Sequence, residues 1–175
     1  MKRFFLFIYY HIVCYLPANQ SAVGKILRCK AIRYHICKHI FKKIGTNVNI
    51  EKGACFGNGN ALEIGDNSGT GMNSIIPYNT KIGKNVMIGP NLFILAHNHS
   101  FSRTDIPMIE QGKNGFEKVT VIEDDVWIGR NVTFTVGRHV AKGSIVAACT
   151  LLCKDFPAYS IIGGNPSKLI KSRLE

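Results

Sequence analysis

The sequence predicts a mainly β protein built around a parallel β-helix. A six-residue repeat runs from Ile44 to Asp155 and is interrupted only at 62–63 and 100–121. Of its 15 hexads, 14 begin with an apolar residue, and 13 carry Asn, Gly or Asp three places later. A strict period of six fits neither an amphipathic helix nor the alternation of a single strand. It is typical of short strands that stack, coil upon coil, into a solenoid.

Within each hexad we expect the first residue to point inward and the fourth to form a corner. Asn, Gly and Asp suit the corner because they tolerate a positive φ. Thr70 is the exception among the inward residues, and His97 and Cys149 are the exceptions at the corners. The hexads begin at Ile44, Ile50, Phe56, Ile64, Thr70, Ile76, Ile82, Ile88, Ile94, Ile122, Ile128, Phe134, Val140, Val146 and Leu152.

Three hexads make one coil, so the pattern predicts about five coils. We place them at 44–61, 64–81, 82–99, 122–139 and 140–157. The expected organisation is therefore a cap at 1–43, a β-helix at 44–157 with an extruded loop at 100–121, and a tail at 158–175. A regular solenoid that tolerates so long an excursion usually uses it for function. The tail is expected to end in a short basic helix after Gly163-Gly164-Asn165-Pro166.

The cap is predicted to hold two helices, at about 2–15 and 25–43, and it is strongly basic. Nine Lys and Arg residues lie within 1–43 with no acidic residue before Glu51, whereas the whole chain carries +11. Such an arm suits an anionic membrane surface or a phosphate-bearing substrate, and a solvated face stays open. We do not expect nucleic acid, because no recognition motif is present. The leading apolar run is too short to span a bilayer. We therefore expect a cytoplasmic protein, with peripheral contact at the inner face of the membrane left open.

The six cysteines do not form a metal-binding pattern. No CxxC pair occurs, and no His–Cys spacing matches a zinc site. We expect buried thiols in a reducing compartment and no bound metal.

Four segments carry a family resemblance. They are ILAHNHSF at 94–101, DVWIGRNV at 125–132, VAKGSIVAACTLLCKD at 140–155 and GNPSK at 164–168. In this order they resemble the hexapeptide-repeat acyltransferases, and within these the sugar and polysaccharide O-acetyltransferases. The resemblance covers about 44–170. It implies a left-handed β-helix, acetyl-CoA as acyl donor, and homotrimers with active sites between neighbouring subunits.

The resemblance also implies the chemistry, which is acetyl transfer to a saccharide hydroxyl. That reaction needs a base near neutral pH, and His99 matches the family's catalytic histidine. His97 is the alternative base, although its corner position makes it a turn and pocket residue. No cysteine lies within the histidine motif, which favours direct transfer without an acyl-enzyme. The acceptor is expected to be a saccharide, and a lipid-linked or nucleotide-linked sugar is consistent with the basic arm.

Further residues are assigned from the same resemblance. The acceptor pocket is expected to include His97, Asn73, Asp105 and Trp127. Each also has an ordinary structural interpretation, namely a turn former for Asn73, a loop cap for Asp105 and surface packing for Trp127. The residues expected to bind coenzyme A are Gly129, Arg130, Ala147, Ala148, Lys154, Lys168 and Lys171. The first four are expected to contribute backbone amides and the lysines to contact phosphates.

Two other functions remain open at this point. A zinc-dependent enzyme resembling the γ-class carbonic anhydrases would use His97 and His99 as two of about three protein ligands. A non-catalytic β-helix that serves as an assembly module would leave the histidine motif unexplained. The identity of the acceptor, O- versus N-acetylation and the length of the acyl chain are not fixed by the sequence.

Overall fold

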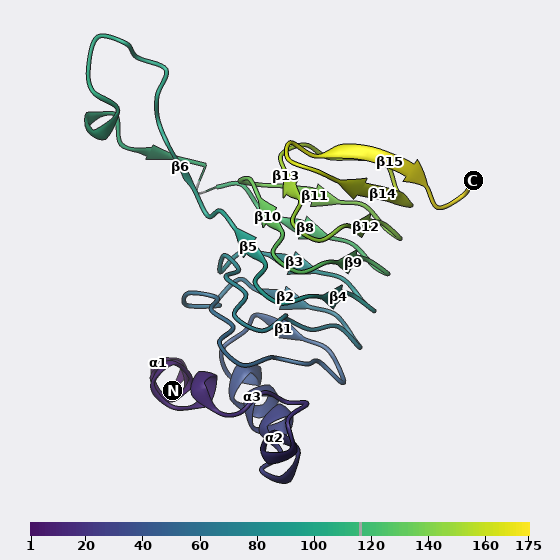
Figure 1. The fold of residues 1–175 in the computed structure, drawn as a ribbon. Helices are drawn as coiled ribbons and strands as arrows, with labels where there is room; N and C mark the ends of the chain where they lie inside the picture. The colour runs from purple at the N-terminus through teal and green to yellow at the C-terminus, as the bar shows by residue number, and fades with distance from the viewer. Residues whose placement is uncertain (116) are drawn as a thin grey trace.

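The molecule is a three-sided prism of stacked coils, closed at one end by helices (Figure 1). The computed structural model describes residues 1–115 and 117–175, so residue 116 of the expected excursion lies outside the described part. Helices at the start of the chain cover the first coil. The last coil is covered by a strand hairpin, and a long arm leaves the prism at one corner.

Each side of the prism is a sheet of short strands joined mainly in parallel, and every strand of these sheets except β14 and β15 has two residues. The first side contains β1 (Lys43–Ile44), β2 (Glu63–Ile64), β3 (Lys81–Ile82), β8 (Val121–Ile122) and β11 (His139–Val140). The second side contains β4 (Met87–Ile88), β9 (Trp127–Ile128), β12 (Ile145–Val146), β14 (Ser160–Gly163) and β15 (Lys168–Ser172). The third side contains β5 (Phe93–Ile94), β10 (Thr133–Phe134) and β13 (Leu151–Leu152). The parallel coils and their number confirm the predicted β-helix.

The core is a stack of the inward hexad residues. Ile64, Ile82 and Ile122 pair in register along the first side, and each is at most 4% exposed. Removing such side chains from water is the main favourable contribution to folding. Thr70, the polar exception, is also buried, and its hydroxyl accepts a hydrogen bond from the Glu51 amide at 3.1 Å. A buried hydroxyl is tolerated here because it has a partner.

Two of the three corners follow the expected turn in every coil. The corner between the first and second sides has positive φ at Asn47, Asn67, Asn85, Asp125 and Gly143. The corner between the second and third sides has it at Gly53, Asn73, Asn91, Asn131 and Cys149. At the third corner, among the described residues, only Gly59 and Gly137 do so. The chain leaves the prism at this less regular corner.

The cap consists of α1 (Lys2–His11), a 3-10 turn (Val13–Tyr15), α2 (Ala22–Ile26) and α3 (Cys29–Lys38). Two tyrosines join α1 to the first coil, since the Tyr9 hydroxyl donates to Ala54 O at 2.7 Å and the Tyr10 hydroxyl to Gly57 O at 2.8 Å. Burial raises the pKa of both phenols well above the ordinary value, so both stay neutral donors. The expected second helix is divided, because Arg28 adopts φ 54 between α2 and α3.

The predicted C-terminal helix is wrong. The chain after Pro157 forms β14 and β15, which pair antiparallel from Ser160–Ser172 to Gly163–Lys168. β14 continues the second side by pairing with β12, so β15 becomes its outermost strand. Hydrogen bonds offered by the last coil outweigh the helical tendency of this short basic segment.

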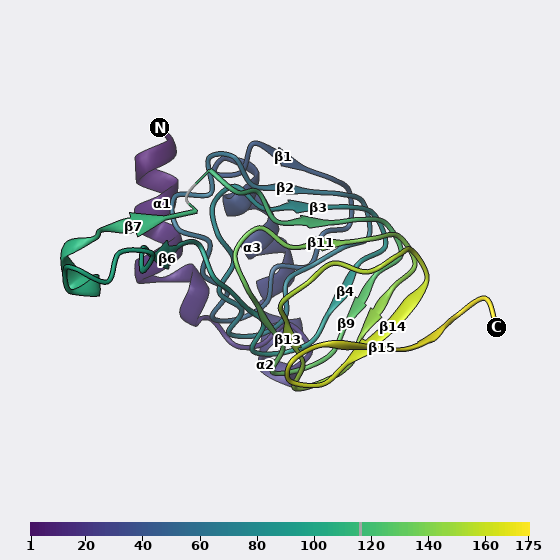
Figure 2. The ribbon, with the colours of Figure 1, turned by 90° about the horizontal axis from the view of Figure 1, so that it is seen from above.

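The expected excursion is an antiparallel arm. Its base is formed by β6 (Asn98–His99) and β7 (Lys113–Asn114), and a 3-10 turn (Met108–Glu110) lies near its tip. Gln111 braces the tip by donating to the carbonyl oxygens of Arg103 at 2.8 Å and Ile106 at 3.1 Å. The arm projects away from the prism in both views (Figures 1 and 2).

Candidate functional site

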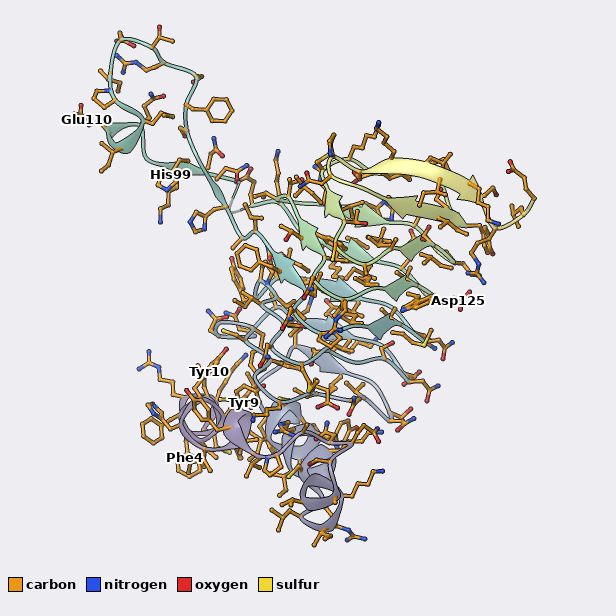
Figure 3. The ribbon with its side chains drawn as sticks, viewed as in Figure 1. Phe4, Tyr9, Tyr10, His99, Glu110 and Asp125 are labelled. Atoms are coloured by element: carbon orange, nitrogen blue, oxygen red, sulfur yellow. The ribbon has the colours of Figure 1, made fainter. Side chains whose placement is uncertain are left out.

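His99 lies at the base of the arm, on the exposed face of the β6–β7 pair. It pairs with Lys113, and the next residue, Ser100, donates its amide to Gly112 O at 3.0 Å. These backbone bonds fix the strand that carries the imidazole. Figure 3 shows His99 beside the prism, with Glu110 farther out on the arm. An exposed imidazole on a fixed strand can accept a proton from a bound hydroxyl near neutral pH.

His97 and Asp105 behave differently from each other. His97 is half-buried at the third corner, two residues before His99. Asp105 is exposed farther along the arm and forms a two-point ion pair with Arg103, with Nε–Oδ1 at 3.0 Å. This guanidinium holds the pKa of Asp105 below its usual range. Within one chain Asp105 therefore braces the arm, and its expected place in the acceptor pocket stays a prediction.

Trp127 belongs to a column of residues on the second side. In-register pairs join Met87, Trp127, Ile145, Ile161 and Lys171 across successive strands, and we call this set the tryptophan column. Trp127 is 50% exposed and Met87 61% exposed. An indole with half its surface open provides a flat apolar wall with a hydrogen-bond donor at its edge.

Gly129 and Ala147 occupy equivalent positions beside this column. Their amides are already used, since Gly129 N donates to Val146 O and Ala147 N to Ile162 O, both at 2.8 Å. The expectation that these two amides bind coenzyme A therefore needs correction. Among the four residues, Arg130 and Ala148 are exposed and lie where the second side turns into the third. They are the remaining candidates for backbone donors to a ligand.

Asn73 lies at that same corner, two coils away from Asn131. Its backbone takes φ 53, and its amide donates to Lys52 O at 2.9 Å. The structure thus places Asn73 with Arg130 and Ala148, and one whole side of the prism separates this corner from His99. The turn explains why Asn occupies this position, and a role in binding an acceptor stays a prediction.

The three lysines lie at the end of the prism remote from the cap. Lys168 and Lys171 are on β15, and Lys154 follows β13 with its Nζ 5.4 Å from the centre of the Phe156 ring. Ser167 joins the two segments, because its hydroxyl accepts from Cys153 N at 3.2 Å. Exposed lysines at this end suit phosphate groups as flexible point charges.

One chain therefore carries two separate groups of candidate residues. His97, His99 and Asp105 lie at the third corner and its arm, whereas Trp127 lies on the second side and Ala148 at the corner between the second and third sides. Asp125, two residues before Trp127, is remote from His99 in Figure 3. A single chain does not bring the histidine to the tryptophan column.

A catalytic metal site would need about three ligating side chains close together. Residues 1–115 and 117–175 contain no group of three or more His, Cys, Asp and Glu side chains that could hold a metal ion. Cys14, Cys29 and Cys37 are buried free thiols, as expected. The expectation of buried thiols is wrong for Cys55 and Cys149, which are exposed because one faces outward from a strand position and the other forms a corner. A zinc site using His97 and His99 would need further ligands from another copy.

Comparison with known proteins identifies the family. No family model matches the sequence. A galactoside O-acetyltransferase of Escherichia coli is 29% identical over 143 residues, covering 79% of this chain and 68% of that protein. A putative acetyltransferase of Saccharomyces cerevisiae is 35% identical over 67% of this chain and 59% of that protein. A hexapeptide-repeat acetyltransferase of Vibrio cholerae, solved with acetyl coenzyme A, has a TM-score of 0.68 and 27% identity over 88% of this chain and 91% of that one.

The chain belongs to the hexapeptide-repeat acetyltransferase family. The family and enzyme class expected from the four motifs are confirmed. Within the described residues of this acetyltransferase, no helix has the length and apolarity needed to cross a bilayer.

Two features of this acetyltransferase lie outside the sequence motifs. Met87 precedes the inward Ile88 as Trp127 precedes Ile128, so their shared hexad position is the signal in the sequence that relates the two residues. The second feature is a hollow between the cap and the first coil. Its walls come from segments distant in sequence, and no local pattern marks them.

Proposed function

We propose that this acetyltransferase transfers the acetyl group of acetyl-CoA to a saccharide hydroxyl. The proposal rests chiefly on His99, which occupies the family's histidine position and lies on a fixed, exposed strand where the coil gives way to the arm. The galactoside specificity in the name of the Escherichia coli relative and the acetyl coenzyme A in the Vibrio cholerae structure support the acceptor and the donor.

In the proposed reaction His99 acts as general base. Its imidazole accepts the proton of the acceptor hydroxyl while that oxygen attacks the thioester carbonyl. The carbon–sulfur bond then breaks, and the thiolate of coenzyme A takes up the proton from His99. Because the acceptor oxygen attacks the thioester directly, no acyl-enzyme forms. A positioned base of this kind contributes on the order of 10²–10⁴ in rate.

The separation of the two residue groups supports a site shared between copies. In the homotrimer we propose, the arm of one subunit brings His99 to the tryptophan column of its neighbour. Cyclic assembly allows this because each copy contributes its His99 to the site shared with one neighbour and its tryptophan column to the site shared with the other. The left-handed winding of the coils, implied by the family, remains part of this proposal.

The donor is proposed to lie along the tryptophan column with its nucleotide end towards Lys154, Lys168 and Lys171. Arg130 and Ala148 would supply backbone contacts to its pantetheine arm. Trp127 would form the wall shared by the acetyl group and the acceptor. The basic cap suits an acceptor that is linked to a nucleotide or a lipid, including one presented at the cytoplasmic face of a membrane.

Acetyl transfer tests the proposal directly. The protein is incubated with acetyl-CoA and a panel of saccharides, and products are identified by mass spectrometry. We expect acetylation of a hydroxyl that falls at least 100-fold in His99→Ala but not in His11→Ala, a cap variant. Full activity of His99→Ala would refute the mechanism, and acetylation of an amine alone would exclude O-transfer. Zinc in stoichiometric amounts in purified active protein would favour the carbonic-anhydrase-like alternative.

A further inference from the structure

A cleft of about 640 Å³ lies between the cap and the first coil. α2 and α3 contribute one wall, and the corner residues Thr46 to Val48 form the other. Val48 is fully buried, and Tyr34 is fixed by a hydrogen bond from its hydroxyl to Gly45 O at 3.0 Å. The volume lies within the range of known small-molecule sites.

The rim of this cleft is cationic. Lys25, Arg28 and Lys30 line it, and across residues 1–115 and 117–175 none of the three forms an ion pair. Lys30 donates instead to the neutral Asn47 side chain at 2.7 Å. Three cations around a partly apolar hollow favour an anionic ligand with an apolar or planar portion.

The carboxylates near the cleft leave this charge uncompensated. Glu51 is buried behind Asn19 and accepts from the Asn19 amide at 3.2 Å. Asp66 accepts from Thr46 N at 2.8 Å and forms an ion pair with Lys84 at 3.4 Å. Both carboxylates accept hydrogen bonds from residues of the cleft wall, and within the described residues neither forms an ion pair with Lys25, Arg28 or Lys30.

The cleft continues towards the proposed active site. A second hollow, of about 330 Å³, shares Gln20, Lys30 and Asn47 with the first and extends along the second side to Met87. Met87 is the partner of Trp127 in the tryptophan column. The coil of Trp127 lies three coils beyond the coil of Asn47. At the usual spacing between strands, the distance between these two coils is about 14 Å.

We propose that this cleft binds a phosphate or diphosphate group of the acceptor. The acceptor would extend along the second hollow, with its reacting sugar at Trp127 and its phosphate about 14 Å away, among Lys25, Arg28 and Lys30. This inference rests on the proposed function and narrows its acceptors to phosphate-linked saccharides. The same chemistry is offered by nucleotide-linked sugars and by lipid-linked sugars.

Binding is tested first with a minimal probe that requires no catalysis. Inorganic pyrophosphate is titrated into the full chain by calorimetry. We expect saturable binding that weakens at least tenfold in the double variant Lys25→Ala/Arg28→Ala. It should weaken as much in Ala31→Trp, which fills the cleft from an exposed position and keeps the charges. The control Lys38→Ala/Lys142→Ala, which removes two exposed cations elsewhere, should bind as the parent does.

The same variants separate this inference from the proposed function. Acetyl transfer is compared between nucleoside diphosphate-linked sugars and the matching methyl glycosides. The cleft variants should lower kcat/KM at least tenfold for the phosphate-linked acceptors and leave it unchanged for the methyl glycosides. Absence of transfer to every acceptor would refute the proposed function while the pyrophosphate result still stands on its own.

A vesicle experiment distinguishes the two sources of phosphate. Phosphatidylcholine vesicles with and without polyprenyl phosphate are sedimented with the protein. Vesicle binding that requires polyprenyl phosphate and is lost in Ala31→Trp would assign a lipid-linked acceptor. Pyrophosphate binding without any binding to the polyprenyl phosphate vesicles would assign a soluble, nucleotide-linked acceptor. Equal pyrophosphate binding by the parent, the cleft variants and the control would overturn the inference.

Discussion

Gly129 and Ala148 lie on adjacent coils with no space for a side chain between them. A Cβ atom added to Gly129 would lie 2.5 Å from the backbone nitrogen of Ala148 and 2.8 Å from its Cα. The glycine is thus required by the stacking of the coils, and the proposed contact of Ala148 with the donor depends on that stacking.

Gly129→Ala should therefore affect stability and donor binding together. The added methyl group must displace the backbone of the next coil, which should lower the free energy of unfolding by about 1–3 kcal/mol. Affinity for coenzyme A should also fall, because Ala148 moves. Chemical denaturation and calorimetry measure the two effects. Ala147→Gly is the matched control, and a Gly129→Ala protein as stable as the parent would contradict the packing.

The buried Arg33 holds the cap on the first coil. Its guanidinium donates to Pro17 O at 3.1 Å, to Leu16 O and to the Asn19 side chain, which in turn donates to Ile50 O at 2.8 Å. Arg33→Met keeps the apolar stem and removes these donors. It should lower the free energy of unfolding by about 2–4 kcal/mol. Lys38→Met on the same helix should change it by less than about 0.5 kcal/mol. Equal stability of both variants would count against this network.

Glu123 gives stability an acid dependence. A hydrogen bond from the Lys142 amide at 2.7 Å, followed by one with His139, holds the pKa of Glu123 below its usual range. Because the folded pKa is depressed, the stabilisation is complete above the unfolded pKa of about 4.3 and is lost as pH falls through the folded value. Solvent screening keeps the effect small, since the side chain is 41% exposed.

Glu123→Gln should therefore reduce stability near neutral pH and flatten its fall on acidification. Urea denaturation at a series of pH values from 7 down to about 3 measures both effects. Glu117→Gln, at an exposed position, serves as control. An unchanged acid profile in Glu123→Gln would show that the hydrogen bonds to Glu123 do not stabilise the fold.

The parts of this fold that follow from local chemistry could be predicted from the sequence. The hexads place the buried Ile64 and Ile82 correctly because inward position and corner are set within six residues. The C-terminal strands could not be predicted in this way, since β15 depends on hydrogen bonds from β14. Nor could the division of the second helix at Arg28, whose left-handed backbone is not favoured by its residue type.

The candidate site shows the same division. The motifs selected His99 and Trp127 as residues, but the side of the prism that separates them is visible only in three dimensions. Likewise, the use of the Gly129 amide within the stack follows from coil pairing and not from the motif. The cleft beside α3 is lined by residues from both the cap and the first coil. The sequence shows how many basic residues the cap carries, but only the fold shows which of them line a cleft.

Complementation between copies tests the shared histidine site most directly. His99→Ala removes the base, and Ala148→Trp, at an exposed position, blocks the proposed donor groove. Each variant alone should be inactive. Co-expressed and randomly assembled, they should regain about a quarter of the parent activity, because that share of sites pairs an intact His99 with an intact Ala148 from the neighbour. A mixture as inactive as either variant alone would contradict a site shared between subunits.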